Sequence, residues 1–227
     1  MKRSAVIIVS VLICMASAVA QGNLEAIRAK AEAGDPAAEV QMGNMYAFGA
    51  GVGRDSQEAV KWFKKAADQG YPDGQYRYGA MYDVGHGVPS DPATAFKWYS
   101  LAAKGGLLDA EYRLGVMYDQ GRGVKKDLAQ AAKWYQVAGD HGRPEAQYRL
   151  GQMYELGQGV GQDYAAAMRW YSKAAEKGRP EAEYRVGYMY EQGLGVPKNT
   201  TEAMKWYKMA ADKGDANAHQ ALIALQK

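Results

Sequence analysis

Residues 79–106 read GAMYDVGHGVPSDPATAFKWYSLAAKGG, and variants of this stretch occur five times in the chain. One glycine and one tryptophan of the stretch recur every 36 residues, without a single insertion between copies. The glycines are Gly43, Gly79, Gly115, Gly151 and Gly187, and the tryptophans are Trp62, Trp98, Trp134, Trp170 and Trp206. A period of this length is typical of a helical repeat protein, in which each repeat buries its apolar side chains against its neighbours.

Each repeat is predicted to form two helices joined by a turn. In the first repeat, the first helix begins near Pro36, because proline suits the first helical position, and it ends at Gly49. The second helix ends at Gly70 and opens with a residue whose side chain accepts hydrogen bonds from free backbone N–H groups. These capping residues are Asp55, Asp91, Asp127, Asp163 and Asn199. A mid-helix glycine such as Gly43 costs about 1 kcal/mol relative to alanine, so its repetition indicates close helix packing.

One helix pair has too little apolar area to fold alone, so the pattern predicts an all-α stack of helix pairs, a solenoid. The predicted repeats are residues 35–70, 71–106, 107–142, 143–178 and 179–214. Residues 21–34 match only a second helix, and residues 215–227 match only a first helix. Both segments are therefore predicted to be capping helices that cover the ends of the stack.

The first twenty residues have the order of a secretory signal peptide. Two basic residues, Lys2 and Arg3, precede an apolar run that ends in small residues at Ala20. The run is shorter than the roughly 20 residues that a membrane-spanning helix needs, so we expect cleavage after Ala20 and a periplasmic or secreted protein. The alternative is an uncleaved anchor, which would make the protein a membrane-tethered regulatory subunit.

Composition excludes several classes of protein. The chain has 227 residues, a formal charge of +3, 48% hydrophobic residues and 23% charged residues, which is unlike a disordered chain or a strongly basic nucleic-acid binder. Its single cysteine, Cys14, lies inside the predicted signal peptide, and Ile13 is a poor match to a lipoprotein signal. The mature protein is therefore expected to contain no disulfide and to depend on core packing.

The repeated motifs Gly-x-Met-Tyr, Gly-x-Gly-Val and Trp-Tyr resemble those of the Sel-one-like repeat (SLR) family, relatives of tetratricopeptide repeats with a longer connection between the helices. The resemblance covers residues 24–227, nearly the whole predicted mature chain. It implies a right-handed α-solenoid that acts as a scaffold or adaptor for protein or peptide partners, often in signalling or in secreted bacterial systems.

Catalytic patterns are missing from the sequence. His86, His141 and His219 have no neighbours at metal-ligand or catalytic-triad spacing, and the Gly-x-Gly-Val loops lack the Gly-Lys-Ser/Thr ending of a phosphate-binding loop. We expect no catalytic residue, cofactor or metal. The alternative is a secreted hydrolase that resembles the cysteine-rich, β-lactamase-like SLR proteins. This chain departs from them because it has no mature cysteine and no Ser-x-x-Lys with the partner motifs.

Residues that bind a partner are expected in columns on one side of the first helices, at positions i, i+3 and i+7. The first column is Gln41, Arg77, Arg113, Arg149 and Arg185. The second is Asn44, Ala80, Val116, Gln152 and Tyr188, and the third is Phe48, Val84, Gln120, Leu156 and Gln192. The SLR resemblance implies that first helices line a concave side. Because arginine suits planar recognition of carboxylates, the predicted partner is a protein or peptide with acidic side chains or a free carboxylate.

Two alternatives remain open at this point. Acidic residues recur in the same helices and can pair with the arginines, in which case the column is structural: Asp83, Glu111, Asp119, Glu155, Glu183 and Glu191. A second cationic column lies beside the tryptophans of the second helices: Lys61, Lys97, Lys133, Arg169 and Lys205. We interpret its long side chains as cover for the apolar stack, and the near-neutral charge argues against binding to RNA or to a membrane surface.

Overall fold

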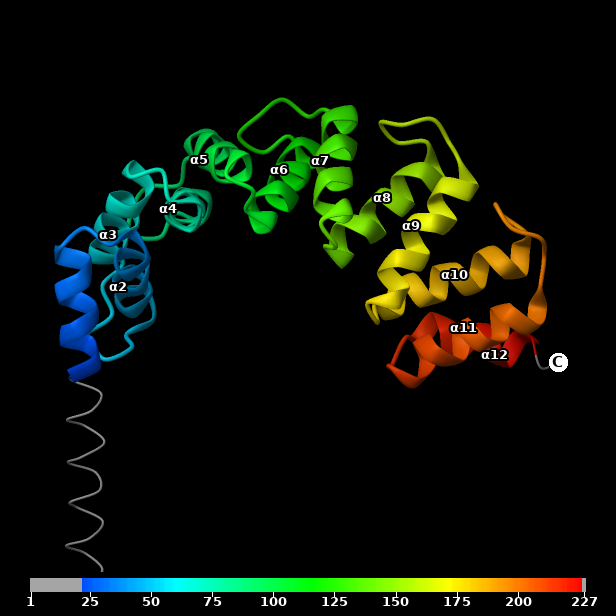
Figure 1. Cartoon of the computed structure of the whole chain (residues 1–227). Helices are drawn as coiled ribbons and strands as arrows, with labels where there is room; N and C mark the ends of the chain where they lie inside the picture. Colours follow the sequence, from blue (N-terminus) through cyan, green and yellow to red (C-terminus); the bar gives the residue numbers. More distant parts are fainter. Residues whose placement is uncertain (1–21, 226–227) are drawn as a thin grey trace, which may run out of the picture. The chain divides into compact units, whose positions relative to one another are not determined.

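The computed structural model describes residues 22–225 and shows helices joined by turns, with no strand in that range (Figure 1). The predicted signal peptide, residues 1–20, lies outside the described residues. Two compact units make up the chain, and the boundary between them falls at Leu107 and Leu108. Each unit is an all-α solenoid of helix pairs, the fold class that the repeat pattern predicts.

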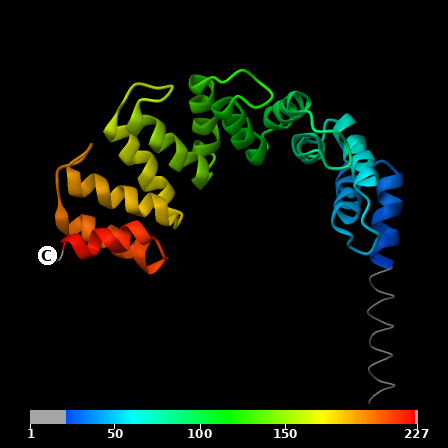
Figure 2. The ribbon, with the colours of Figure 1, turned by 180° about the vertical axis from the view of Figure 1, so that it is seen from behind.

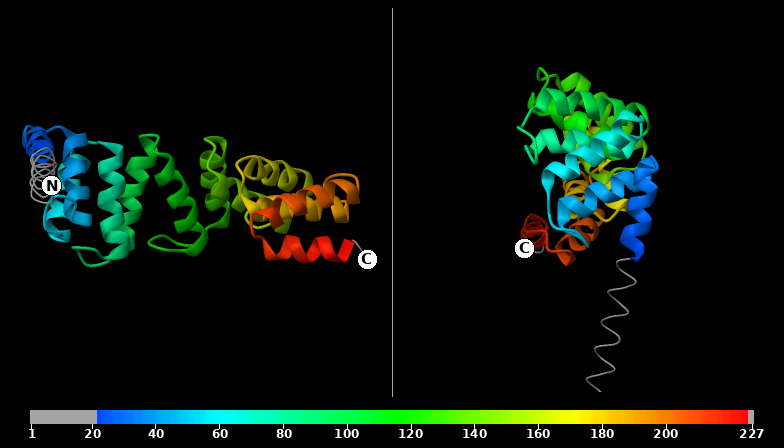
Figure 3. Two further views of the ribbon diagram at one scale, coloured as in Figure 1. Left: turned by 90° about the horizontal axis from the view of Figure 1, so that it is seen from below. Right: turned by 90° about the vertical axis from the view of Figure 1, so that its left-hand side faces the viewer.

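Unit 1 contains the first two repeats. A helix over residues 22–32 precedes two helix pairs, α2 (Pro36–Phe48) with α3 (Ser56–Asp68) and α4 (Pro72–Val84) with α5 (Pro92–Lys104). Helix α3 also packs against α4, and α2 contacts α4, so the first helices of consecutive repeats are neighbours. The left panel of Figure 3 shows the helices of this unit side by side.

Unit 2 contains the last three repeats, and its helices are also arranged as successive pairs (Figure 2). They are α6 (Leu108–Gln120), α7 (Leu128–Asp140), α8 (Pro144–Leu156), α9 (Tyr164–Glu176), α10 (Pro180–Gln192), α11 (Thr200–Asp212) and α12 (Ala216–Leu225). Each helix packs against the next one along the chain, and α12 packs against α11 at the end of the unit.

The helix ends confirm the predicted start and stop residues. Four first helices begin at a proline, and the capping side chain of every second helix accepts a hydrogen bond from a backbone N–H group. In α3, for example, Asp55 accepts from the N–H groups of Gln57 and Glu58 at 2.9 and 3.1 Å. Gly49 closes α2 with a φ of 74°, a left-handed conformation that glycine adopts without strain.

The mid-helix glycines also have the predicted role of close packing. A Cβ atom on Gly115 or Gly151 would lie 2.6 Å from the Cδ1 atom of Tyr135 or Tyr171, respectively. These tyrosines come from the second helix of the same repeat, and Tyr171 is fully buried. The glycine therefore lets the two helices of a pair approach until the ring of one lies on the backbone of the other.

The tryptophans are less buried than the sequence pattern predicts. Trp62 and Trp170 are only partly buried, whereas the next residue of each repeat, such as Tyr171, lies inside the core. Lysine side chains cover the exposed ring faces, with Lys65 Nζ 3.9 Å from the centre of Trp62 and Lys173 Nζ 4.1 Å from that of Trp170. These lysines lie outside the predicted cationic column, which therefore does not supply the ring cover at these two positions.

Candidate functional site

The third predicted column is the most exposed part of the candidate site. Phe48, Val84 and Leu156 are the last residues of α2, α4 and α8, and their exposed fractions are 77%, 71% and 59%. Gln120 and Gln192 end α6 and α10 in the same way and are also exposed. We call the surface that the three columns form within each unit the first-helix face.

The second column is only partly available to a partner. In unit 2, Val116 and Tyr188 are half-buried and pack against core clusters. Gln152 is engaged within its own helix, because it accepts a hydrogen bond from Arg149 at 3.1 Å and donates one to the Tyr148 hydroxyl at 3.3 Å. The exposed contacts of this face are therefore provided mainly by the third column.

The arginine column is divided between the units. Gln41 and Arg77 lie on α2 and α4 of unit 1, and Gln41 is exposed. Arg113, Arg149 and Arg185 lie on α6, α8 and α10 of unit 2.

In unit 2, Arg149 is bound by a carboxylate of the preceding repeat. Its Nη2 atom lies 2.8 Å from Asp119 Oδ2, and the same oxygen accepts a hydrogen bond from the Tyr135 hydroxyl at 3.2 Å. Burial disfavours the charge of Arg149, but the hydrogen bond and the negative charge of Asp119 outweigh it and raise the pKa of Arg149. Burial, followed by the charge of Asp119, raises the pKa of Tyr135, so its hydroxyl stays a donor.

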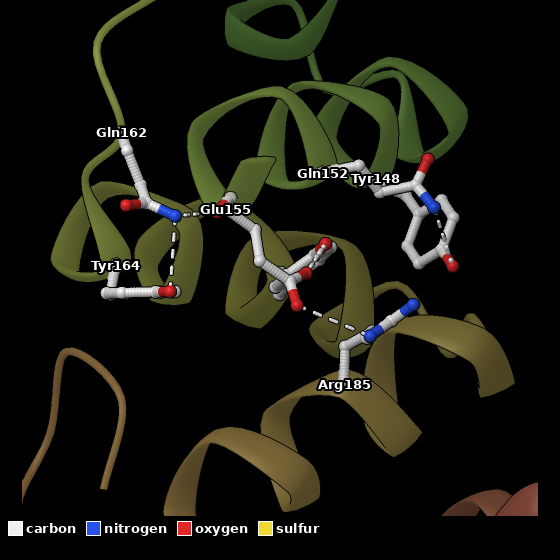
Figure 4. Close-up of polar contacts among 7 residues, drawn as sticks. Tyr148, Gln152, Glu155, Gln162, Tyr164 and Arg185 are labelled. Carbon is white, nitrogen blue, oxygen red and sulfur yellow. Dashed lines mark hydrogen bonds and ion pairs between the residues drawn. The ribbon is translucent and has the colours of Figure 1, made fainter. Parts of the chain in front are cut away.

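The next repeat contains the same three-residue arrangement. The Tyr171 hydroxyl donates to Glu155 Oε2 at 2.5 Å. Arg185 Nη1 lies 3.3 Å from Glu155 Oε1 (Figure 4). Burial, together with the hydrogen bond to Glu155, raises the pKa of Tyr171. We call this arrangement the acid–Tyr–Arg triad. It joins the first helix of one repeat to both the second helix of that repeat and the first helix of the next.

For two of the recurring acids, Asp119 and Glu155, the triads support the alternative interpretation, in which the arginines pair with acids of the same chain and the column is structural. The series of triads stops at Glu191. This acid accepts a hydrogen bond from the Tyr207 hydroxyl at 2.6 Å, but it has no arginine partner from the next repeat, because Ala221 occupies that position of the arginine column. Recognition of an acidic partner by Arg149 or Arg185 must therefore compete with an intramolecular carboxylate.

Two other acids do not pair with the arginine column. Glu111 and Glu183 are buried, and each contacts the residue that caps the C-terminus of the second helix of its own repeat. Glu111 contacts His141 Nδ1 at 2.8 Å, and Glu183 forms an ion pair with Lys213. This buried column was not predicted from the sequence, although its signal is visible there as an alternation of glutamate and glutamine: Glu39, Gln75, Glu111, Gln147 and Glu183.

Two cavities lie at equivalent positions of the first-helix face. In unit 1, a cavity of about 190 Å³ is lined by Ala47, Phe63 and Arg77. In unit 2, a cavity of about 550 Å³ is lined by the residues 72 positions later, Asp119, Tyr135 and Arg149. Both lie where the first helices of consecutive repeats meet.

A loop contact orders the rim of the unit 1 cavity. Gly87 has a φ of 77°, and a Cβ atom there would lie 2.3 Å from the Ser56 carbonyl oxygen, so only glycine lets the α4–α5 loop approach α3 this closely. The adjacent His86 contacts the Ser56 hydroxyl at 2.6 Å and Arg54 Nη2 at 3.3 Å, both through Nε2. His86 thus positions a second cationic side chain, Arg54, beside the cavity.

Residues 22–225 contain no group of three or more His, Cys, Asp or Glu side chains placed to hold a metal ion. In the same range, every helix is too short or too polar to cross a bilayer.

Solved structures similar to this chain have the same repeat architecture. A protective antigen from uropathogenic Escherichia coli with an SLR fold is 42% identical, with a TM-score of 0.85, and the match covers 88% of this chain and 43% of that one. A Sel1 repeat protein from Oxalobacter formigenes is 39% identical, with a TM-score of 0.79, and the match covers 88% and 58% of the two chains. This chain thus spans about half the length of these two proteins. Among curated proteins, none matches the chain.

Sel1 repeat proteins are typically scaffolds that bind other proteins, and they are generally not catalytic. The Sel1 repeat family matches five segments, which together cover most of the chain: residues 36–71, 72–107, 108–142, 144–178 and 180–215. The chain therefore belongs to the Sel1 repeat family.

Proposed function

We propose that this protein is an exported, non-catalytic scaffold that binds a protein or peptide partner through its first-helix face. The observation that carries the proposal is the exposure of Phe48, Val84 and Leu156 at one position of the repeat. Three large apolar side chains at equivalent helix ends can contribute hydrophobic contact area to a partner in either unit. The polar residues next to these side chains would orient the partner through hydrogen bonds.

The partner is proposed to carry acidic side chains or a free carboxylate. In unit 2 the intramolecular triads already satisfy Arg149 and Arg185, so a partner gains less from these arginines than from the exposed third column. In unit 1 the acid of the triad is replaced by Ala47, and the cationic residues Arg54 and Arg77 line the cavity. Unit 1 is therefore the preferred place for an acidic group of the partner.

Export is proposed from the order of residues 1–20, where Lys2 and Arg3 precede an apolar run and small residues. The mass of the intact protein purified from the exported fraction tests this step. Loss of residues 1–20 is expected. Retention of these residues would favour the membrane-tethered alternative instead.

Site-specific photo-cross-linking in the native host tests the binding face. A benzophenone amino acid is introduced at Val84 or Leu156 on the first-helix face, and at the exposed Lys97 or Arg169 on second helices as matched controls. We expect a specific partner adduct from the first two positions only. Adducts confined to Lys97 and Arg169, with helicity by circular dichroism unchanged, would move the binding surface to the second helices and refute the proposal.

A further inference from the structure

The cavity of unit 1 combines an apolar wall with a cationic one. Phe63 and Met81, both buried core residues, line one part of it, and Arg54 and Arg77 line another. Its volume of about 190 Å³ lies below the roughly 300–1,000 Å³ of sites for drug-sized ligands, which favours a single amino-acid residue as the occupant.

Two of the substitutions that distinguish this cavity from the equivalent one in unit 2 concern the acid–Tyr–Arg triad. Ala47 stands where unit 2 has Asp119, and Phe63 stands where it has Tyr135, whereas the arginine is present in both. The carboxylate of the triad and the hydroxyl that donates to it are thus missing together. Arg77 consequently has no acid from the preceding repeat at the triad position.

Arg77 is held only weakly by its own helix. Its Nε atom donates to Asp73 at 3.1 Å, and the side chains of this pair are 35% and 33% exposed, which is typical of an ion pair that contributes little to stability. Within residues 22–225, its Nη groups make no hydrogen bond, so one edge of the guanidinium is available to a planar acceptor. A carboxylate bound there would occupy the chemical role that Asp119 has for Arg149.

A second polar group that lines the cavity, Asn44, lacks a hydrogen-bond donor in the described part of the chain. The Oδ1 atom of Asn44 is buried and accepts no hydrogen bond from the described residues. A buried acceptor without a donor is unfavourable, and a ligand that brings an N–H group would satisfy it. The cavity therefore offers Arg77 to a carboxylate, Asn44 Oδ1 to an N–H donor, and Phe63 to an apolar group.

We propose that the unit 1 cavity binds the C-terminal residue of a partner polypeptide whose last side chain is apolar. Such a residue carries its α-carboxylate, its backbone N–H and its side chain on one carbon atom, so all three can enter a cavity of this size. The carboxylate pairs with Arg77, with Arg54 as a second cation, and the N–H donates to Asn44. This inference rests on the proposed function, because it names the chemical group of the partner that unit 1 recognises.

Titration with three short peptides tests the proposal on the isotopically labelled protein, expressed as the full chain. The probes are N-acetyl-Ala-Ala-Leu with a free carboxylate, the same peptide with a C-terminal amide, and N-acetyl-Ala-Asp-Leu amide, which carries only a side-chain carboxylate. By NMR, we expect the free acid to bind at least about tenfold more tightly than either amide, the difference of one charge-assisted hydrogen bond. Equal affinity for the free acid and its amide would overturn the proposal, and equal affinity for the Asp peptide would show that a side-chain carboxylate is the ligand.

Variants locate the binding within the chain. Arg77→Gln should abolish the preference for the acid over the amide, whereas Arg149→Gln, the matched change in unit 2, should leave it intact. Ala47→Asp places a carboxylate on α2 at the position of Asp119 and should block binding by occupying Arg77 from within. A preference that survives Arg77→Gln and Ala47→Asp with unfolding curves like those of the parent protein would refute the site. Should Arg77→Gln fail to fold, Ala47→Asp alone decides the outcome.

The peptide titration and the cross-linking fail independently. If the peptides do not bind but Val84 and Leu156 still form partner adducts, the first-helix face is the binding surface and only the C-terminal-residue inference is wrong. If the adducts are absent and the peptides bind with dependence on Arg77, the cavity is a binding site without the extended face. If neither the partner adducts nor peptide binding is observed, both the proposed binding face and the proposed cavity site are refuted.

Discussion

The cavities of unit 1 and unit 2 are built from the same repeat but differ in what satisfies the arginine. In unit 2, Arg149 contacts Asp119 of the preceding repeat, and Tyr135 secures that carboxylate. In unit 1, Ala47 and Phe63 remove both groups, and the arginine is left with a partner on its own helix. Loss of one carboxylate and one hydroxyl can thus convert a structural contact between repeats into a potential ligand site.

A parallel difference separates the buried glutamates of the two units. Glu39 of unit 1 accepts a hydrogen bond from Gln69, a neutral amide, at 2.7 Å, whereas Glu183 of unit 2 pairs with the cation of Lys213. Burial raises the pKa of Glu39, and the charge of Lys65 and the Gln69 hydrogen bond oppose that change only in part. At this buried position, the first repeat provides less compensation for charge than the last one does.

The largest expected effect compares two mid-helix glycines. Gly151→Ala should lower the free energy of unfolding by about 3 kcal/mol, because the new Cβ meets Tyr171, whose ring is held by the hydrogen bond to Glu155. At Gly43 the new Cβ would lie 2.4 Å from Phe63 Cε1, but Gly43→Ala should cost about 1 kcal/mol less, because Phe63 has no hydroxyl that ties its ring to an acid. Urea unfolding measures both changes. Equal losses would show that the triad does not fix the ring.

Most of the fold could be predicted from sequence because it depends on local rules. Proline at a helix start, Asp55 as a cap, and Gly49 in a left-handed turn each act within a few residues. The depth of the tryptophans could not be predicted, because Trp62 is covered by a lysine three residues along, and apolar periodicity does not distinguish a core ring from a ring under an aliphatic stem.

The pairing of the site residues depends on distances between helices, which a single-helix pattern does not contain. Glu111 and Arg113 are two residues apart, and side chains at that spacing point to different sides of a helix, so this acid does not fit the alternative interpretation of the arginine column. Asp119 of α6 contacts Arg149 of α8, which lies 30 residues away in the sequence. The exception at Ala47 and Phe63 was nevertheless visible in the sequence, as two departures from otherwise regular columns.

The next effect tests whether the triad acts as a unit. Glu155→Ala should lower the free energy of unfolding by about 2 kcal/mol, because it leaves the buried Tyr171 hydroxyl and Arg185 without their shared acceptor. Tyr171→Phe alone should cost less. The double variant should lose about 1 kcal/mol less than the sum of the losses in the two single variants. A double-mutant cycle by urea unfolding measures this difference. Simple additivity would mean that the contacts are independent.

The reverse change should rebuild the triad in unit 1. Ala47→Asp combined with Phe63→Tyr should raise the free energy of unfolding by about 1 kcal/mol, the net contribution of a typical hydrogen bond, provided that Arg77 turns from Asp73 to the new carboxylate. Ala47→Asp in a background with Arg77→Gln is the control and should give no gain. A gain that persists without the arginine would attribute the stability to another contact.

The smallest effect concerns Glu39. Glu39→Gln should raise the free energy of unfolding at neutral pH by less than about 0.5 kcal/mol, because glutamine can keep a hydrogen bond to Gln69 without a buried charge. Gln75 already occupies the equivalent position of the next repeat in a buried site, so the shape of the side chain is accommodated there.

The pH dependence of this gain follows from the raised pKa of Glu39. The folded state holds the proton more tightly than the unfolded state, so the cost of the ionised group is complete above the folded pKa and is absent below the ordinary value of 4.5. The advantage of Glu39→Gln should therefore be present at about pH 7 and vanish at about pH 4 in urea unfolding. Glu183→Gln should have the opposite sign at neutral pH, because Lys213 loses its counter-charge. If both substitutions stabilised the protein equally, the cation of unit 2 would contribute nothing, and the difference between the two units would be confined to the triad.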